Sequence, residues 1–311
     1  MLNQSKPTLA FNLKPGTRLV GKWKRNSYVI QQVLGKGAIG AVYLAKQSDK
    51  KLVALKISDK VASISSEINV LQKLAKVRGN SPGPSLYEVD DWLAPDGICY
   101  PFYTMEYVQG SELSSFLNNR GSAWLGLLLS QLLEELDQLH QIGFIVGDLK
   151  LENVIVTNSP IRLRFIDVGG VTQIGRSVKE YTEFYDRGYW QCGDRKAEPS
   201  YDLFALAMLA LQCVYPNRFK KTEDAKGLLL AKIKQAKVLS AYELVLSRAV
   251  SGRYQTAISM RQDLKKVLIL QTKVEQPTAT VHKGRSQNRD WLEIFMFGLS
   301  SLIFYLLTAF Y

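Results

Sequence analysis

An acid, a base and an amide lie at fixed spacing inside a mostly apolar stretch, FIVGDLKLENVIV, at residues 144–156. They are Asp148, Lys150 and Asn153. The apolar flanks predict two short buried strands, so the polar groups belong to the connection between them. A solvated turn would explain Asp148 and Asn153, which are turn formers. A catalytic loop explains all three, because a carboxylate can accept a proton while a lysine stabilises developing negative charge.

A second acid follows in the stretch FIDVGG, where Asp167 stands between apolar neighbours and precedes two glycines. Mg²⁺ prefers oxygen ligands, so Asp167 and Asn153 are candidate ligands for Mg²⁺, or for Mn²⁺, bound together with ATP. In such a site Asp148 would orient a substrate hydroxyl and accept its proton. Lys150 would stabilise the transferring phosphoryl group.

Three glycines are spaced as G-x-G-x-x-G in GKGAIGAVY, residues 35–43. A glycine-rich turn lets backbone amides approach phosphates without a side chain in the way. These glycines connect two predicted strands rather than a strand and a helix, which favours a flap over a nucleotide. The ATP-binding residues predicted in this segment are Gly35, Lys36, Gly37, Gly40 and Val42.

The stretch VALK places Lys56 in a predicted apolar strand, where its ammonium needs an anionic partner such as a nucleotide phosphate. Glu67, in the next predicted helix, is expected to hold this lysine in place. Ala54 and the hinge residues Glu106 and Tyr107 complete the predicted ATP site, because a strand that runs into a glycine-containing connection offers backbone groups to an adenine ring. The alternative for Lys56 is a surface lysine whose stem covers apolar side chains.

These groups need a small strand-rich unit followed by a larger helical one, and hydrophobic periodicity predicts both. The predicted strands lie within residues 28–57 and 98–107, and the predicted helices span residues 65–77, 122–143, 201–215, 226–239 and the segment to about Leu270. We therefore expect an α+β, bilobal fold with an N-terminal lobe at residues 27–106 and a C-terminal lobe at residues 107–270. Three cysteines without a CxxC pair exclude a disulfide framework and a zinc site.

Charge is unevenly distributed in this 311-residue chain of net charge +12. Residues 1–48 carry eight basic and no acidic residues, and residues 218–289 carry 16 basic and five acidic residues. The basic ends predict an anionic partner, either an anionic membrane or DNA bound through its phosphates, and charge alone leaves both open. The candidate anion or DNA contacts are Lys283, Arg285 and Arg289.

The last 18 residues, IFMFGLSSLIFYLLTAFY, contain no charged side chain. As a helix they would extend about 27 Å, close to the thickness of a bilayer's hydrocarbon core. We expect a single transmembrane anchor at residues 291–311, although a buried core helix is the alternative. Residues 271–290 are expected to be a basic juxtamembrane linker, which predicts a cytoplasmic catalytic domain at the cell membrane. Residues 1–26 are expected to be a basic N-terminal extension.

Taken in order, the motifs resemble those of the Hanks-type (eukaryotic-like) serine/threonine protein kinases over about residues 27–270. The resemblance rests on the glycine loop, Lys56, Glu67, Met105 at the gatekeeper position, D-L-K-x-x-N at 148–153 and D-V-G at 167–169, with Asp202 and Arg253 matching later structural residues of the family. It implies a bilobal kinase fold, ATP with a divalent metal, and phosphoryl transfer to Ser or Thr hydroxyls of protein substrates. The short anchor and basic segment are similar to small bacterial membrane kinases of the YabT type, which implies spore development and DNA contact.

The chain departs from the family pattern in the catalytic loop, where Val146-Gly147-Asp148 replaces His-Arg-Asp. The missing arginine normally clamps a phosphorylated activation loop, so we expect loop phosphorylation not to switch this enzyme in the usual way. A hypothetical substitute for this phosphorylation switch is DNA that promotes contact between two copies of the chain in a homodimer. Ala-Pro-Glu is also absent, and Arg187-Gly188-Tyr189 occupies its place.

Three hydroxyls after Asp167 are candidate autophosphorylation sites: Thr172, Ser177 and Thr182. Two other functions are kept as alternatives to a protein kinase. One is a small-molecule kinase of the aminoglycoside-phosphotransferase kind, and the other is a non-catalytic, nucleotide-sensing DNA or membrane adaptor. Lys150, two residues after Asp148, favours the protein kinase.

Overall fold

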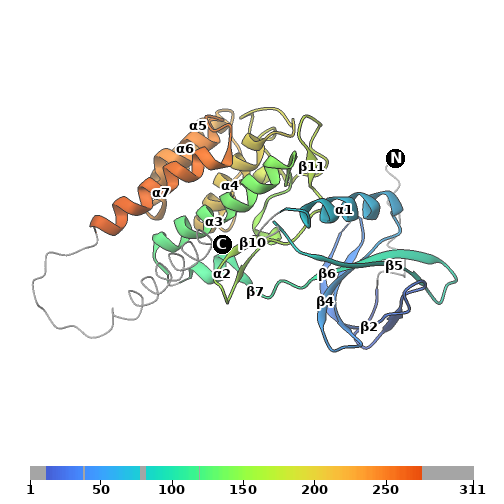
Figure 1. The fold of residues 1–311 in the computed structure, drawn as a ribbon. Helices are drawn as coiled ribbons and strands as arrows, with labels where there is room; N and C mark the ends of the chain where they lie inside the picture. The colour runs from blue at the N-terminus through green and yellow to red at the C-terminus, as the bar shows by residue number, and fades with distance from the viewer. Residues whose placement is uncertain (1–11, 38, 78–81, 119, 275–311) are drawn as a thin grey trace, which may run out of the picture. The chain divides into compact units, whose positions relative to one another are not determined.

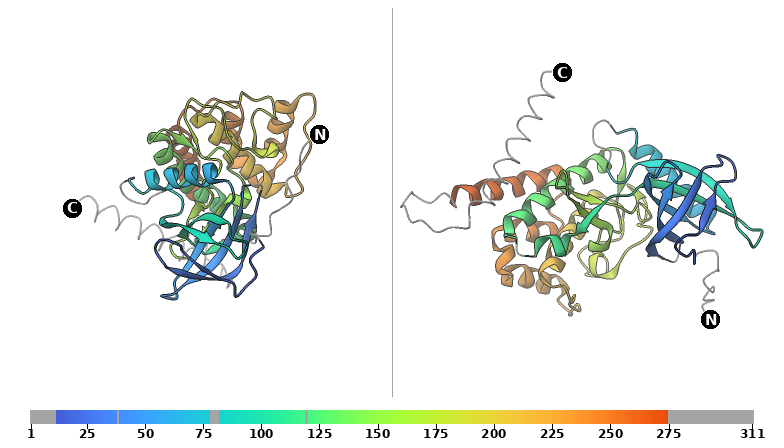
Figure 2. Two further views of the ribbon diagram at one scale, coloured as in Figure 1. Left: turned by 90° about the vertical axis from the view of Figure 1, so that its right-hand side faces the viewer. Right: turned by 90° about the horizontal axis from the view of Figure 1, so that it is seen from below.

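A computed structural model of the chain describes residues 12–37, 39–77, 82–118 and 120–274. They form a strand-rich N-terminal lobe and a helical C-terminal lobe, joined by the chain after strand β6 (Figure 1). Figure 2 shows the blue strands of the first lobe on one side and the green to orange helices of the second on the other. The predicted bilobal α+β fold is confirmed.

The N-terminal lobe is built on one six-stranded antiparallel sheet with the order β1-β2-β3-β4-β6-β5. Its strands are β1 (Arg18–Val20), β2 (Ser27–Lys36), β3 (Ala41–Gln47), β4 (Leu52–Ile57), β5 (Leu86–Leu93) and β6 (Cys99–Glu106), and its helix is α1 (Val61–Leu74). Alternating apolar residues such as Tyr28, Ile30 and Tyr43 are fully buried, as expected where one face of a sheet covers a core. Because β1 pairs with β2, the sheet begins before residue 27, where the sequence placed the lobe boundary.

Register within this sheet places the predicted nucleotide-binding residues on neighbouring strands. Val42 of β3 lies opposite Lys56 of β4, and Ala54 of β4 lies opposite Met105 of β6. Because side chains alternate across a strand, Ala54 and Lys56 lie on the same face of the sheet.

The C-terminal lobe contains the helices and several short strands. Its helices are α2 (Leu113–Leu117), α3 (Ser122–Gln141), α4 (Pro199–Val214), α5 (Ala225–Gln235), α6 (Glu243–Val250) and α7 (Ala257–Val274), with one-turn 3₁₀ segments at Leu151–Asn153 and Glu183–Tyr185 and a longer one at Lys237–Tyr242. Its strands are β7 (Gly110–Glu112), β8 (Phe144–Ile145), β9 (Val154–Thr157), β10 (Leu163–Phe165) and β11 (Thr172–Gln173). Helix α4 is buried on nearly every face, which explains why its sequence is apolar all round.

Within the part of the chain that the structure describes, no helix is long and apolar enough to cross a membrane. The anchor predicted at residues 291–311 lies outside that part, and so do Lys283, Arg285 and Arg289. The predictions for these residues therefore stay predictions. Helix α7 continues past residue 270, where the sequence placed the start of the linker.

Candidate active site

The loop that carries Asp148 is held by hydrogen bonds to Asp202, a completely buried acid on helix α4. Asp202 Oδ2 accepts a hydrogen bond from the Val146 amide at 2.8 Å, and Oδ1 accepts one from the Gly147 amide at 3.0 Å. His140 Nε2, at the end of α3, lies 2.9 Å from Asp202 Oδ2. The sequence analysis missed His140, and the only available signal was that the chain contains two histidines.

Gly147 stands where the resembling family usually carries arginine. Its φ is +78°, in the left-handed region, and a Cβ at this position would lie 2.6 Å from the Gly170 carbonyl oxygen. The Gly170 backbone therefore leaves no room for a side chain, and glycine also avoids the strain of positive φ. The turn in this chain therefore requires glycine at residue 147 and could not hold the arginine that the family usually has there.

The three polar groups of the opening stretch come together around the Asp148 carboxylate, which is almost completely buried. Lys150 Nζ donates a hydrogen bond to Asp148 Oδ2. Asn153 Nδ2 donates to the backbone oxygen of Asp148 at 3.0 Å. Thr182 Oγ1 donates to Asp148 Oδ1 at 2.8 Å and also lies 3.3 Å from Lys150 Nζ. The carboxylate is therefore oriented both by its own loop and by the segment that follows Asp167.

Lys56 is buried and lies between two acids. Its Nζ is 2.7 Å from Glu67 Oε2 on α1 and 3.6 Å from Asp167 Oδ1. The Tyr103 hydroxyl donates to the same Glu67 oxygen at 2.6 Å. Burial by itself would lower the pKa of Lys56, but Asp167 and Glu67 outweigh it and raise that pKa above its ordinary value. The lysine therefore stays charged, as a phosphate contact requires.

The predicted phosphate and metal residues line one cleft of about 760 Å³. The lining residues include Gly35, Lys36, Gly37, Gly40, Val42, Lys56, Asp148, Lys150, Asn153, Asp167 and Thr182. A Cβ on Gly35 or Gly37 would meet open space, whereas one on Gly40 would lie 2.3 Å from the Ile57 carbonyl oxygen. The loop therefore leaves the mouth of the cleft open and packs tightly where it returns to strand β3.

Asp167 and Asn153 fit a hard divalent cation by their chemistry. The Asp167 side chain is 45% exposed, although its neighbours Lys56 and Glu67 are buried, so an acid oxygen faces the cleft. In the described residues no group of three or more His, Cys, Asp or Glu side chains could hold a metal ion. The donor set suits Mg²⁺, which commonly binds one or two protein oxygens together with phosphates and water.

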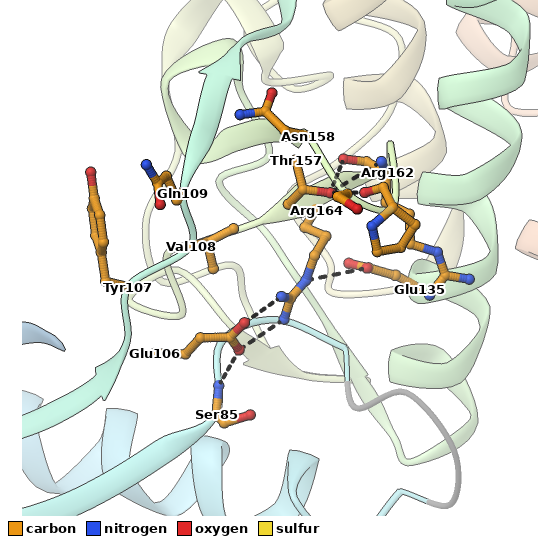
Figure 3. Close-up of a pocket in the computed structure, with 12 residues that line it drawn as sticks. Ser85, Glu106, Tyr107, Val108, Gln109, Glu135, Thr157, Asn158, Arg162 and Arg164 are labelled. Atoms are coloured by element: carbon orange, nitrogen blue, oxygen red, sulfur yellow. Dashed lines mark hydrogen bonds and ion pairs between the residues drawn. The ribbon is translucent and has the colours of Figure 1, made fainter. Parts of the chain in front are cut away.

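The two predicted hinge residues, Glu106 and Tyr107, line a separate cavity and not the cleft that contains Lys56. The Glu106 side chain points to Arg164, 2.6 Å from its Nη1 (Figure 3). A contact between Glu106 and an adenine ring would therefore use backbone atoms. Ala54 and Met105 are buried together in the core, with Val42 packed against it, so an apolar wall precedes the hinge.

Two cleft residues after Asp167 were missed by the sequence analysis, because no motif marks them. Glu180 lines the cleft. Its pKa is raised mainly by burial and in addition by the negative charge of the nearby Asp167 carboxylate. Lys179 also lines the cleft and donates to Ser66 Oγ on α1 at 2.9 Å. This second contact ties the segment after Asp167 to the helix that carries Glu67.

The three candidate autophosphorylation hydroxyls have different surroundings. Thr172 is completely buried, donates to the Gly170 oxygen at 2.8 Å and accepts from the Lys179 amide at 3.2 Å. Thr182 is bound to Asp148. Ser177 is exposed. In this conformation Ser177 is the only exposed residue of the three, since Thr172 is buried and Thr182 is intermediate.

The segment at residues 186–198 has ion pairs of its own where the family's Ala-Pro-Glu is absent. Arg187 Nη2 lies 2.9 Å from Asp194 Oδ1 and 2.8 Å from Glu198 Oε1. Asp186, which is completely buried, lies 2.7 Å from Arg195. The exposed Arg253 is not part of this network, so Arg187 and Asp186 hold the segment to the C-terminal lobe instead.

Comparison with known proteins gives a consistent result. The family described as protein kinase domain matches residues 28–280. The chain is 48% identical to the serine/threonine-protein kinase YabT of Bacillus subtilis over 265 residues, which cover 85% of this chain and 78% of that protein. It is 26% identical to the probable serine/threonine-protein kinase YbdM of the same bacterium, over 78% and 90% of the two chains. It is 33% identical to the serine/threonine-protein kinase pkn3 of Myxococcus xanthus, over 48% of this chain and 29% of that protein.

Proposed function

This chain belongs to the protein kinase family and is a serine/threonine protein kinase, and from that premise we propose the roles of its residues in phosphoryl transfer from ATP to protein hydroxyls. Asp148 orients the substrate hydroxyl and accepts its proton. Lys150, which contacts the same carboxylate, stabilises the charge that develops on the transferred group. The observation that carries the proposal is the gathering of Asp148, Lys56 and Asp167 in one cleft.

The phosphates would be held by Lys56 and by the amides of the glycine loop, residues 35–40. Glu67 keeps the Lys56 ammonium at the cleft, because the two groups are buried together at 2.7 Å. Asn153 and Asp167 would hold the metal ion, Mg²⁺ or Mn²⁺, which neutralises phosphate charge when bound. Thr182 would keep the Asp148 carboxylate oriented until a substrate hydroxyl takes its place.

A labelling experiment tests this assignment. The purified protein is incubated with labelled ATP, Mg²⁺ and a generic basic protein, alongside the variants Lys56→Ala and Asp148→Asn. Both substitutions are expected to reduce protein labelling by at least about a hundredfold, since the first removes a phosphate contact and the second removes the group that accepts the hydroxyl proton. Lys46→Ala is the matched control, because Lys46 is an exposed lysine on the neighbouring strand β3.

Three outcomes would contradict the proposal. Labelling of a soluble metabolite only would identify a small-molecule kinase, and labelling that survives in Asp148→Asn would remove this residue from the chemistry. No labelling with any acceptor would favour a nucleotide-sensing adaptor.

The proposal extends to the cell. We propose that the kinase is tethered to the inner face of a bacterial membrane and contacts DNA through its basic C-terminal region. The uncharged terminal 18 residues and the 16 basic residues against five acidic ones at 218–289 support this. The resemblance to the YabT type adds a role in spore development, and DNA would promote contact between two copies.

Salt dependence separates electrostatic DNA stimulation from other effects. Duplex DNA is expected to increase protein labelling at about 50 mM salt, and the increase should largely disappear at about 200 mM salt because counterion release drives such binding. The triple variant at Lys283, Arg285 and Arg289, each changed to Ala, should lose the stimulation. Stimulation of equal size at both salt concentrations would contradict the idea.

A further inference from the structure

A second cavity, of about 720 Å³, lies behind the hinge (Figure 3). It shares no lining residue with the catalytic cleft. It is lined by the hinge residues 106–109, by residues 157–160 at the end of strand β9 and just after it, and by Glu135 of helix α3. Arg164 of strand β10 also lines it. Only two residues separate this arginine from the metal-binding candidate Asp167. A shift of Arg164 would therefore also shift Asp167 in the catalytic cleft.

Arg164 contacts three separate parts of the chain. Its Nη1 lies 2.6 Å from Glu106 Oε1 and its Nη2 lies 3.1 Å from Glu106 Oε2, a two-point contact with the hinge. Nη2 also donates to the Gly83 carbonyl oxygen at 2.6 Å, in the connection between α1 and β5. Nε lies 3.9 Å from Glu135 Oε1 on α3. The Ser85 amide donates to Glu106 Oε2 at 3.2 Å, which joins the same connection to the hinge.

These contacts are sheltered from solvent. The Arg164 side chain is 18% exposed and that of Glu106 is 27% exposed. Burial and Arg164 act in opposite directions on the pKa of Glu106, and the net result lowers it, while Glu106 and Glu135 raise the pKa of Arg164. Both partners are therefore charged at neutral pH, and a two-point arginine–carboxylate contact fixes orientation as well as distance.

The contacts of Arg164 with Glu106 and Gly83, called the clamp below, lie in a tightly packed region. Gly83 has φ +74°, and a Cβ there would lie 2.6 Å from the ring of Phe165, the residue next to Arg164. The connection from α1 is thus pressed against strand β10 at the same place where Arg164 binds it. A shift of the guanidinium would move the hinge, this connection and β10 relative to one another.

We propose that Arg164 is a positioning residue for phosphoryl transfer: by binding Glu106 and Gly83 it holds the hinge at a set distance from Asp167. The adenine end of the nucleotide would lie at the hinge and the metal-bound end at Asp167, so the clamp sets the span over which ATP must fit. The inference rests on the proposed function of Asp167 and of the hinge. A misplacement of about 1 Å at a reacting group can lower a rate by about a hundredfold.

The test compares substitutions on both sides of the clamp. Arg164→Met removes the charge and both hydrogen bonds, Arg164→Lys keeps the charge without the fork, and Glu106→Gln weakens the partner. Arg162→Met is the matched control, because Arg162 lines the same cavity while the hinge carboxylate is bound by Arg164. For each variant we would measure KM for ATP, kcat, the Kd for ADP by calorimetry, and thermal unfolding.

Arg164→Met is expected to raise KM for ATP and Kd for ADP about tenfold, with Arg164→Lys and Glu106→Gln in between and Arg162→Met within about twofold of the wild type. The double variant Arg164→Met with Glu106→Gln should add little to Arg164→Met alone, because the two residues act through one contact. A general loss of structure would not give this order or this non-additivity.

The proposal is overturned if folded Arg164→Met matches the wild type in KM and Kd, if the two substitutions are additive, or if Arg162→Met causes the same loss. Should Arg164→Met fail to unfold cooperatively, Arg164→Lys and Glu106→Gln decide the question by the same measurements. Absence of Asp148-dependent labelling in the wild type would contradict the proposed function instead, while ADP binding would still test Arg164.

Discussion

At the scale of single residues, Glu135 is a largely buried acid whose charge is only partly compensated. Its Oε2 is a buried atom without a hydrogen-bond partner among the described residues, and its nearest cation, Arg164, is 3.9 Å away and already binds Glu106. Burial raises the pKa of Glu135 from 4.5 to about 7, with Arg164 and Arg162 only partly offsetting it. This acid therefore opposes folding once it is ionised.

The sign of the pH effect follows from this shift. Below about pH 4.5 Glu135 is protonated in both states, whereas between pH 4.5 and 7 the unfolded chain loses the proton first. Stability contributed by this group is therefore lost as the pH rises toward 7. Glu135→Gln removes the effect, so relative to the wild type it should gain about 2 to 3 kcal/mol of unfolding free energy between pH 5 and pH 8.5.

Urea titrations of the wild type and of Glu135→Gln at both pH values measure this difference. Glu134→Gln is the control on the same helix, since Glu134 is 43% exposed and binds Arg261. A difference between wild type and Glu135→Gln that is the same at pH 5 and pH 8.5 would show that the carboxyl ionises normally.

At the scale of elements, the turn between β8 and the loop at residues 151–153 fixes the place of Asp148. Its backbone amides bind Asp202 of α4, and its φ of +78° at Gly147 brings it against Gly170. The turn therefore connects the buried helix α4 with Asp148 and with the segment that follows Asp167. Any side chain at residue 147 should disturb all three.

Gly147→Ala tests the turn against a glycine of equal φ. Gly97 also has φ +78°, in the connection between β5 and β6, but a Cβ there would meet no atom within 4 Å. Gly97→Ala is expected to cost only about 1 to 2 kcal/mol of stability from left-handed strain, with normal activity. Gly147→Ala should cost more and lower kcat at least about tenfold, because it displaces the neighbouring Asp148.

Kinase assays and chemical unfolding of the two variants provide the comparison. Equal losses of stability in both, with normal kcat in Gly147→Ala, would mean that Gly170 moves aside and that the turn is not rigid.

At the scale of the whole molecule, polar contacts with different chemistry join the lobes in the cleft and behind the hinge. In the cleft, Lys56, Glu67 and Asp167 bring β4, α1 and the segment before β11 together. Behind the hinge, Arg164 joins β10 to Glu106 and Gly83. The described residues up to 271 belong to one compact unit that includes both places. A change at the rear contact is therefore expected to reach the catalytic cleft through the strand that ends before Asp167.

The sequence by itself determined the motif order, the two lobes and the family, because hydrophobic periodicity and glycine placement are local properties of the chain. The spacing of Lys56, Asp148 and Asp167 therefore sufficed to predict a nucleotide site. Only the tertiary structure decided the partners: Thr182 reaches Asp148 across 34 residues and Arg164 reaches Glu106 across 58. Such contacts depend on how distant segments fold back on one another, and no local pattern marks the residues that will meet.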